Sequence, residues 1–145
     1  MEKRETMTKY KGKVKIINEA TNEVFEYDNI VVIGFYTLVS QLMTEDSQPL
    51  GIDYLGIGTG SSAEDIDDTA LASEHGSRLQ AISRTYNGSE MTFTFQITGS
   101  DALFTWRELG LFNASTSGIM TNRTVINFTH SAGQPVTIIW IIDKA

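Results

Sequence analysis

Acidic side chains gather in one short segment of the sequence, and they are the first candidates for chemistry. The segment contains Glu64, Asp65, Asp67, Asp68 and Glu74. Carboxylate oxygens are the ligands that Ca²⁺ prefers, so an irregular calcium site is one interpretation. An EF-hand loop is excluded, because its sixth position must be glycine and counting from Asp65 places Ala70 there. We favour a solvated loop leading into a short helical turn over residues 69–75, with Asp67 or Asp68 as its cap.

A glycine-rich run follows a strand-like segment and invites comparison with phosphate-binding loops. Residues 56–62 read Gly-Ile-Gly-Thr-Gly-Ser-Ser. A P-loop needs a lysine beside its Ser or Thr, and the dinucleotide fingerprint needs glycine where Ser61 stands. Neither requirement is met. We therefore expect a strand that ends in a tight turn, with glycines that take positive φ angles.

Catalytic groups of the common kinds are scarce. The absence of cysteine excludes disulfides, thiolate metal sites and cysteine nucleophiles. His75 and His130 are the only histidines, and no serine stands in a nucleophile elbow. Glu108 is the most notable single acid, because it follows Arg107 within an otherwise apolar strand, and we expect a structural ion pair of the two at a sheet margin. The sequence predicts neither an enzyme nor a cofactor.

Charge is distributed unevenly along the 145 residues. The net charge of −7 argues against nucleic acid as a partner, because phosphate binding needs a basic face. Basic residues crowd the first fifteen positions, whereas residues 16–77 contain no Lys or Arg and twelve Asp or Glu. We interpret residues 1–11 as a basic arm and residues 12–145 as one domain. The arm residues predicted to contact a neighbouring subunit are Lys3, Arg4, Lys9 and Lys11; a solvated arm is the alternative.

Two stretches of the sequence bear on targeting and on membrane insertion. Residues 1–10 are polar, without the apolar region and cleavage site of a signal peptide. The longest apolar stretch, residues 30–42, is too short and too interrupted to span a bilayer. We expect a protein made in the cytoplasm that does not enter a membrane.

Most of the secondary-structure elements that must position the candidate residues are strands. Residues 91–98 alternate apolar and polar side chains, and Asn87-Gly88 before them is typical of a hairpin turn. A change of hydrophobic phase at residues 107–108 predicts a β-bulge. One helix is expected near residues 34–43, where apolar residues recur at helical spacing. The other expected strands are residues 12–18, 24–27, 52–57, 79–86, 104–111, 119–128 and 135–142.

These elements predict an all-β fold. Strands at this spacing, with turn signals between them, must bury their apolar faces on one another. The sequence therefore predicts an antiparallel β-sandwich of about eight strands, jelly-roll-like, with one short helix.

Four segments carry a further signal in their order and spacing. They are residues 53–60 (DYLGIGTG), 68–74 (DTALASE), 106–113 (WRELGLFN) and 137–142 (TIIWII). Together they resemble a group of small structural proteins of tailed bacteriophages, and residues 12–17, 21–24 and 29–34 fit the hairpin and helix entry of that group. The resemblance covers about residues 12–142. It implies a tail-fibre, baseplate or appendage component, and it transfers no catalytic residue.

The resemblance implies a non-enzymatic virion protein that forms part of the tail, baseplate or tail fibre, or attaches to it. Its expected partners are copies of itself and other virion proteins. A capsid decoration or head-fibre protein is the alternative within the same class. A module that binds host surface glycans is the alternative from another class, with Tyr54, Tyr86 or Trp106 as aromatic platforms for sugars.

The last expected strand is apolar on both faces. Val136, Ile138, Trp140 and Ile142 share one face, and Ile139 and Ile141 share the other. A monomeric two-layer sandwich requires only one apolar face, so either the predicted helix or another subunit must cover the second. We favour another subunit, which makes Ile139 and Ile141 the predicted interface residues. The resemblance implies a trimer.

Overall fold

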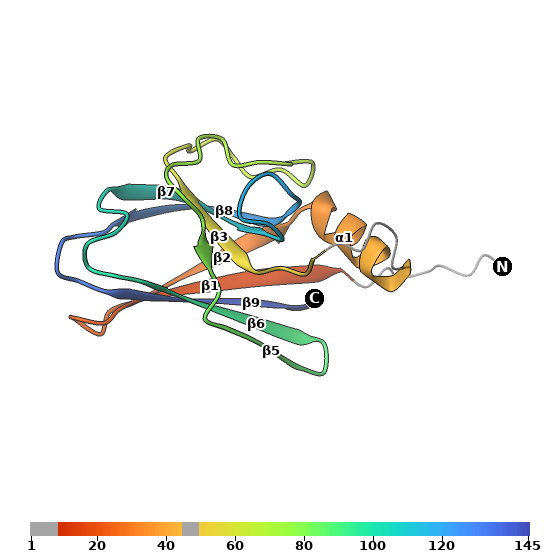
Figure 1. The fold of residues 1–145 in the computed structure, drawn as a ribbon, viewed down its shortest axis with the longest axis horizontal. Helices are drawn as coiled ribbons and strands as arrows, with labels where there is room; N and C mark the ends of the chain where they lie inside the picture. The colour runs from red at the N-terminus through yellow and green to blue at the C-terminus, as the bar shows by residue number, and fades with distance from the viewer. Residues whose placement is uncertain (1–8, 45–49) are drawn as a thin grey trace.

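The computed structural model of the protein describes residues 9–44 and 50–145. Within these residues the fold consists of nine strands, which all pair antiparallel in one sheet, and one helix (Figure 1). The elements in chain order are β1 (Tyr10–Asn18), β2 (Val24–Val31), α1 (Ile33–Thr44), β3 (Tyr54–Gly58), β4 (Leu79–Gln80), β5 (Ser83–Asn87), β6 (Glu90–Ile97), β7 (Thr105–Phe112), β8 (Met120–Thr129) and β9 (Val136–Lys144).

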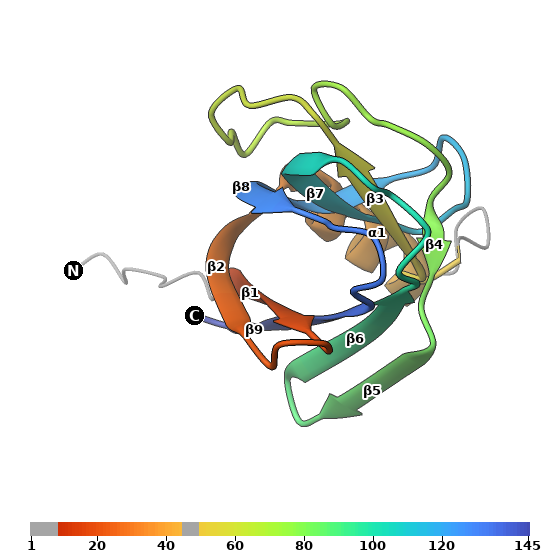
Figure 2. The same ribbon diagram turned by 90° about the vertical axis from the view of Figure 1, so that its left-hand side faces the viewer.

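The sheet curls until its two ends approach each other. Its strand order is β4-β3-β7-β8-β2-β1-β9-β6-β5. β2 joins the two halves, because residues 24–29 pair with β1 whereas Ile30 and Val31 pair with β8. The end strands β4 and β5 are separated in the chain only by Ala81 and Ile82, and Figure 2 shows this segment connecting the halves on the side opposite β2. The predicted all-β fold is confirmed, and its two layers are halves of one curled sheet.

The interior of the curled sheet is filled by alternate side chains of its strands. Both tryptophans, Trp106 of β7 and Trp140 of β9, are fully buried there. On β6 the inward side chains are Phe93, Phe95 and Ile97, which confirms the period of two expected for residues 91–98. Close packing of large apolar side chains is what stabilises a fold of this size without disulfides.

Helix α1 closes one end of the curled sheet (Figure 1). Its buried residues, Phe35 and Leu38, belong to the interior core, and the Phe35 ring lies 4.9 Å from the ring of Tyr10 at the start of β1. The predicted helix is therefore confirmed. Because α1 packs against the inward-facing core, it does not serve as a cover for the outward side chains of β9.

Three expectations about local structure have different outcomes. The predicted bulge is confirmed, since the register of β7 against β8 shifts between Trp106 and Glu108. The single strand expected over residues 79–86 is two strands, β4 and β5, because the chain crosses there from one end of the sheet to the other. The helical turn expected over residues 69–75 is wrong: the segment contains bends at Ala70, Ala72 and Ser73, and Glu74 forms a β-bridge with Gly58.

Candidate functional site

Glu108 on β7 is a buried carboxylate that binds a surface loop in the half of the sheet that contains β3, β7 and β8. The side chain has no exposed area. Its Oε2 accepts hydrogen bonds from the backbone N–H of Gly60 at 2.8 Å and of Ser73 at 2.7 Å, and its Oε1 accepts one from the N–H of Ala72 at 2.7 Å. A carboxylate with this many donors is fully compensated for the loss of water.

Arg123 on β8 is the charged partner of Glu108. Its Nε donates to Oε1 of Glu108 at 3.1 Å, and only 1% of the arginine side chain is exposed. Its Nη1 donates to the carbonyl of Ala63 and to Oδ2 of Asp68, and its Nη2 donates to the carbonyl and hydroxyl oxygens of Ser62. All five guanidinium donors are thus used.

The Glu108–Arg123 pair fastens residues 59–74 onto the outer face of the sheet. The acid binds both ends of this loop, at Gly60 and at Ala72–Ser73, and the arginine binds its middle. Leu71 of the loop is buried in a second apolar cluster with Val32, Phe112 and Met120. Removing Arg123 would leave the buried Glu108 carboxylate without its cation, and removing Glu108 would leave the buried Arg123 with Asp68 as its carboxylate partner.

The ion pair expected between Glu108 and Arg107 is wrong. Arg107 is exposed, whereas Glu108 is fully buried and bound to other residues. Glu108 also does not lie at a sheet margin, since β7 pairs with β3 on one side and β8 on the other. The true partner, Arg123, lies fifteen residues further along the chain, and no local pattern in the sequence connects it to Glu108.

The glycines of residues 56–60 are required for a reason that differs from the one expected. None of Gly56, Gly58 and Gly60 takes a positive φ angle. The expectation of a positive-φ turn is therefore wrong. A Cβ atom at Gly58 would lie 2.5 Å from the carbonyl oxygen of Ser73 and 2.6 Å from Oε2 of Glu108. Close approach of the fastened loop excludes a side chain there.

The carboxylates of the acidic segment form hydrogen bonds and ion pairs with different parts of the protein. Asp68 binds Arg123, Asp65 accepts from the backbone N–H of Asp67, and Glu64 accepts from the N–H of Val125. Glu74 accepts from Nε and Nη2 of Arg78. Across the part of the chain that the structure describes, no three His, Asp or Glu side chains converge as metal ligands would. The carboxylates of Glu64, Asp65, Asp68 and Glu74 thus each bind another group of the protein.

Ile139 and Ile141 lie on the outer face of β9 and are half-buried. In the sheet, Ile139 is flanked by Lys15 of β1 and Thr94 of β6. Ile141 is flanked in the same way by Lys13 and Thr92. The structure therefore places both predicted interface residues at the surface, as an apolar pair with a basic row on one side and threonines on the other.

The predicted basic arm overlaps the first strand. Lys11 lies within β1, where it is paired with Asp143 of β9, and the carbonyl of Lys9 accepts a hydrogen bond from the N–H of Ala145. The Ser89 hydroxyl lowers the pKa of Asp143, and the Lys144 backbone N–H does so further. Lys3 and Arg4 lie outside the described residues.

The three aromatic residues suggested as sugar platforms differ in exposure. Trp106 is fully buried, and its indole N–H donates to the carbonyl of Ala102, so that it offers no surface to a ligand. Tyr54 is half-buried, and Tyr86 is 83% exposed on the β5–β6 hairpin. Only Tyr86 remains an open platform among these three.

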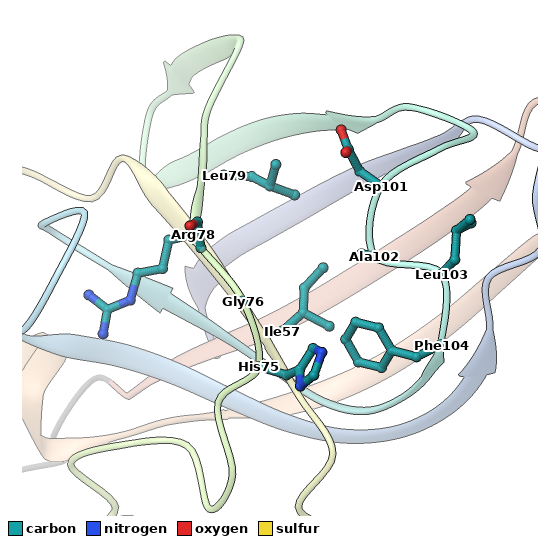
Figure 3. Close-up of a pocket in the computed structure, with 10 residues that line it drawn as sticks. Ile57, His75, Gly76, Arg78, Leu79, Asp101, Ala102, Leu103 and Phe104 are labelled. Atoms are coloured by element: carbon teal, nitrogen blue, oxygen red, sulfur yellow. The ribbon is translucent and has the colours of Figure 1, made fainter.

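A cavity of about 540 Å³ lies between residues 75–79 and the loop that connects β6 to β7. In Figure 3 the rings of His75 and Phe104 lie next to each other at one end of the cavity, and Asp101 lies at the other. The centroids of the His75 and Phe104 rings are 4.5 Å apart. The apolar side chains of Ile57 and Leu79 lie between the two ends (Figure 3). Sequence reasoning missed this site, because its walls come from segments that no motif connects.

Comparison of the chain with family models, with curated proteins and with solved structures finds no match. Within residues 9–44 and 50–145, no helix has the length and apolar character needed to cross a bilayer.

Proposed function

We propose that this protein is a non-enzymatic structural component of a tailed-bacteriophage virion, either part of the tail, baseplate or tail fibre or a module that attaches to it. One observation carries the proposal. Three segments that together resemble phage structural proteins, residues 53–60, 68–74 and 106–113, meet at the buried Glu108. These three segments therefore form one structural unit in this fold, and the proposal rests on the resemblance of that unit to phage structural proteins.

The hydrogen bonds of this unit leave its two charged residues no part in catalysis. The Glu108 carboxylate and the Arg123 guanidinium are buried and saturated with protein partners, so neither has a free position for a substrate. A group that acts as a general acid or base must reach the proton that it transfers. The role that fits both residues is to hold a surface loop rigid.

Analysis of purified virions tests the proposal. Mass spectrometry should detect this chain in the particles, and cryo-electron microscopy should show a curled nine-stranded sheet in the tail, baseplate or fibre. Density on the capsid would select the alternative of a decoration or head-fibre protein. Absence of the chain from particles that are otherwise complete would contradict both.

We further propose that copies of the chain associate through the outer face of β9. Ile139 and Ile141 form an apolar centre, and Lys13 and Lys15 beside them contact Glu26 at 3.6 and 3.8 Å. An apolar centre with a polar rim is the usual anatomy of a protein interface. Because both isoleucines are already half-buried, the gain per strand is below the roughly 3–6 kcal/mol of two fully exposed ones. The resemblance favours a trimer.

Light scattering at tens of micromolar should give the wild-type protein a mass of three times 16.1 kDa. The double variant Ile139→Thr and Ile141→Thr should be monomeric with an unchanged circular dichroism spectrum, because its substitutions remove apolar contact area outside the core. The control is the double variant Ile66→Thr and Ile82→Thr, whose side chains are 53% and 59% exposed elsewhere. It should keep the wild-type mass. A wild-type mass of 16.1 kDa would contradict self-association.

The basic arm is a second proposed contact in the assembly. Lys3, Arg4, Lys9 and Lys11 carry a charge opposite to that of the acidic remainder of the chain. Interactions between exposed charges weaken as salt screens them. The same light-scattering measurement in 1 M NaCl should therefore show a smaller mean mass, and an unchanged mass would leave the arm without a role in assembly.

A further inference from the structure

We propose that the cavity between His75, Phe104 and Asp101 binds a short neutral glycan, with a sugar ring packed against Phe104. The cavity volume of about 540 Å³ lies within the range of small-ligand sites. This inference goes beyond the structural role proposed above and does not depend on it.

The wall that carries Asp101 and Phe104 is fixed by buried side chains. Ala102 between them has a φ angle of 51°, which is rare for a residue with a Cβ atom. Its carbonyl oxygen accepts a 2.9 Å hydrogen bond from the Trp106 indole and lies 3.2 Å from Nδ1 of the buried His130. The wall is thus shaped before any ligand arrives, and a preformed site avoids the entropic cost of ordering a loop.

The charges around the cavity disfavour an anionic ligand. Arg78 is the only arginine or lysine among the described residues that line it, and its guanidinium binds Glu74 and the carbonyls of Ala114 and Ser117. It also lies 3.5 Å from the centre of the Phe112 ring and points away from the other lining residues (Figure 3). Asp101 is exposed and adds negative charge to a chain that already carries −7. Phosphates and carboxylates would meet repulsion here.

The remaining side chains match a molecule that is apolar on one face and polar at its edges. Phe104, Leu79 and Ile57 supply the apolar surface. The carboxylate of Asp101 accepts a hydrogen bond from Thr98 and keeps further acceptor capacity. Within the described residues, the ring nitrogens of His75 have no hydrogen-bond partner. A pyranose ring presents C–H groups on its face and hydroxyl groups around its edge, and therefore fits both kinds of wall.

The test begins with a glycan array probed with the intact protein. A neutral glycan that binds should then shift the amide signals of Gly76 and Ala102 in a ¹⁵N NMR titration. Asp101→Ala and Phe104→Leu should each weaken its affinity at least tenfold, because one removes a hydroxyl acceptor and the other removes the aromatic face. Melting curves of both variants establish that they remain folded.

The matched control is Tyr86→Ala, which removes the exposed aromatic ring of the β5–β6 hairpin and should leave the affinity unchanged. Loss of binding in this control, with Phe104→Leu and Asp101→Ala unaffected, would move glycan binding away from the cavity and overturn the proposal. Binding of no glycan on the array would overturn it as well. Both outcomes leave the virion assignment unaffected, since that assignment is tested on particles.

Discussion

Replacing Glu108 by alanine should lower the free energy of unfolding by about 3–5 kcal/mol, the range for breaking a buried ion pair by removing one partner. The substitution would remove the fully buried carboxylate partner of Arg123 and leave the guanidinium with the partly exposed Asp68. It would also leave the N–H groups of Gly60, Ala72 and Ser73 without their acceptor. Domains are stable by only about 5–15 kcal/mol, so this single change removes a large share.

Urea denaturation followed by tryptophan fluorescence measures the loss of stability, and the control is the neighbouring residue. Arg107→Ala removes an exposed side chain and should change stability by less than about 0.5 kcal/mol. Hydrogen exchange at Gly60, Ala72 and Ser73 should accelerate in the Glu108→Ala variant more than exchange in β9. If Glu108→Ala and wild type unfold at the same urea concentration, the bonds around Glu108 contribute nothing net to the fold.

Gly58→Ala should destabilise the protein by about 2–3 kcal/mol, because the added methyl group overpacks a site that cannot expand. The atoms that it would meet are the Ser73 carbonyl oxygen at 2.5 Å and Oε2 of Glu108 at 2.6 Å. Oε2 is itself fixed by the N–H groups of Gly60 and Ser73. Relief of the overlap would therefore lengthen hydrogen bonds that hold the loop.

Gly51→Ala is the matched control for this prediction. A Cβ atom at Gly51 would have no neighbour within 4 Å among the described residues, and Gly51 does not take a positive φ angle. Replacing glycine where the backbone is compatible with alanine stabilises slightly, by about 0.4–1 kcal/mol, through the unfolded state. Equal urea midpoints for the Gly58→Ala and Gly51→Ala proteins would show that the loop moves aside freely.

The two predictions concern residues whose types are unusual in the sequence but whose roles depend on contacts that the sequence does not show. Glu108 stood out as an acid in an apolar strand, and residues 56–60 stood out as glycine-rich. In both cases the local pattern suggested a local cause, an ion pair with Arg107 and a turn with positive φ angles. The actual causes are contacts with residues 60–73 and with Arg123, which are distant along the chain.

What the sequence determined by itself is the local structure that depends on near neighbours. The alternation over residues 91–98, the Asn87-Gly88 turn, the phase change at Glu108 and the helical spacing near residues 34–43 all produced the expected element. These signals work because a strand or helix exposes one face at a fixed period, so that burial appears directly in the order of side chains. The helical turn expected over residues 69–75 from an aspartate cap is absent, and the backbone N–H groups of Ala72 and Ser73 bind Glu108 instead.

Only the tertiary structure decided which segments meet. Pairing of β7 with β3 and β8 places Glu108 and Arg123 side by side under the loop of residues 59–74, and this contact gives Glu108 its partners and excludes side chains at Gly58. It also places Ile139 and Ile141 on the outer face and joins residues 75–79 to the β6–β7 loop around a cavity. Such pairings depend on sheet order and register, and a period of two along a strand carries no information about which strand lies beside it.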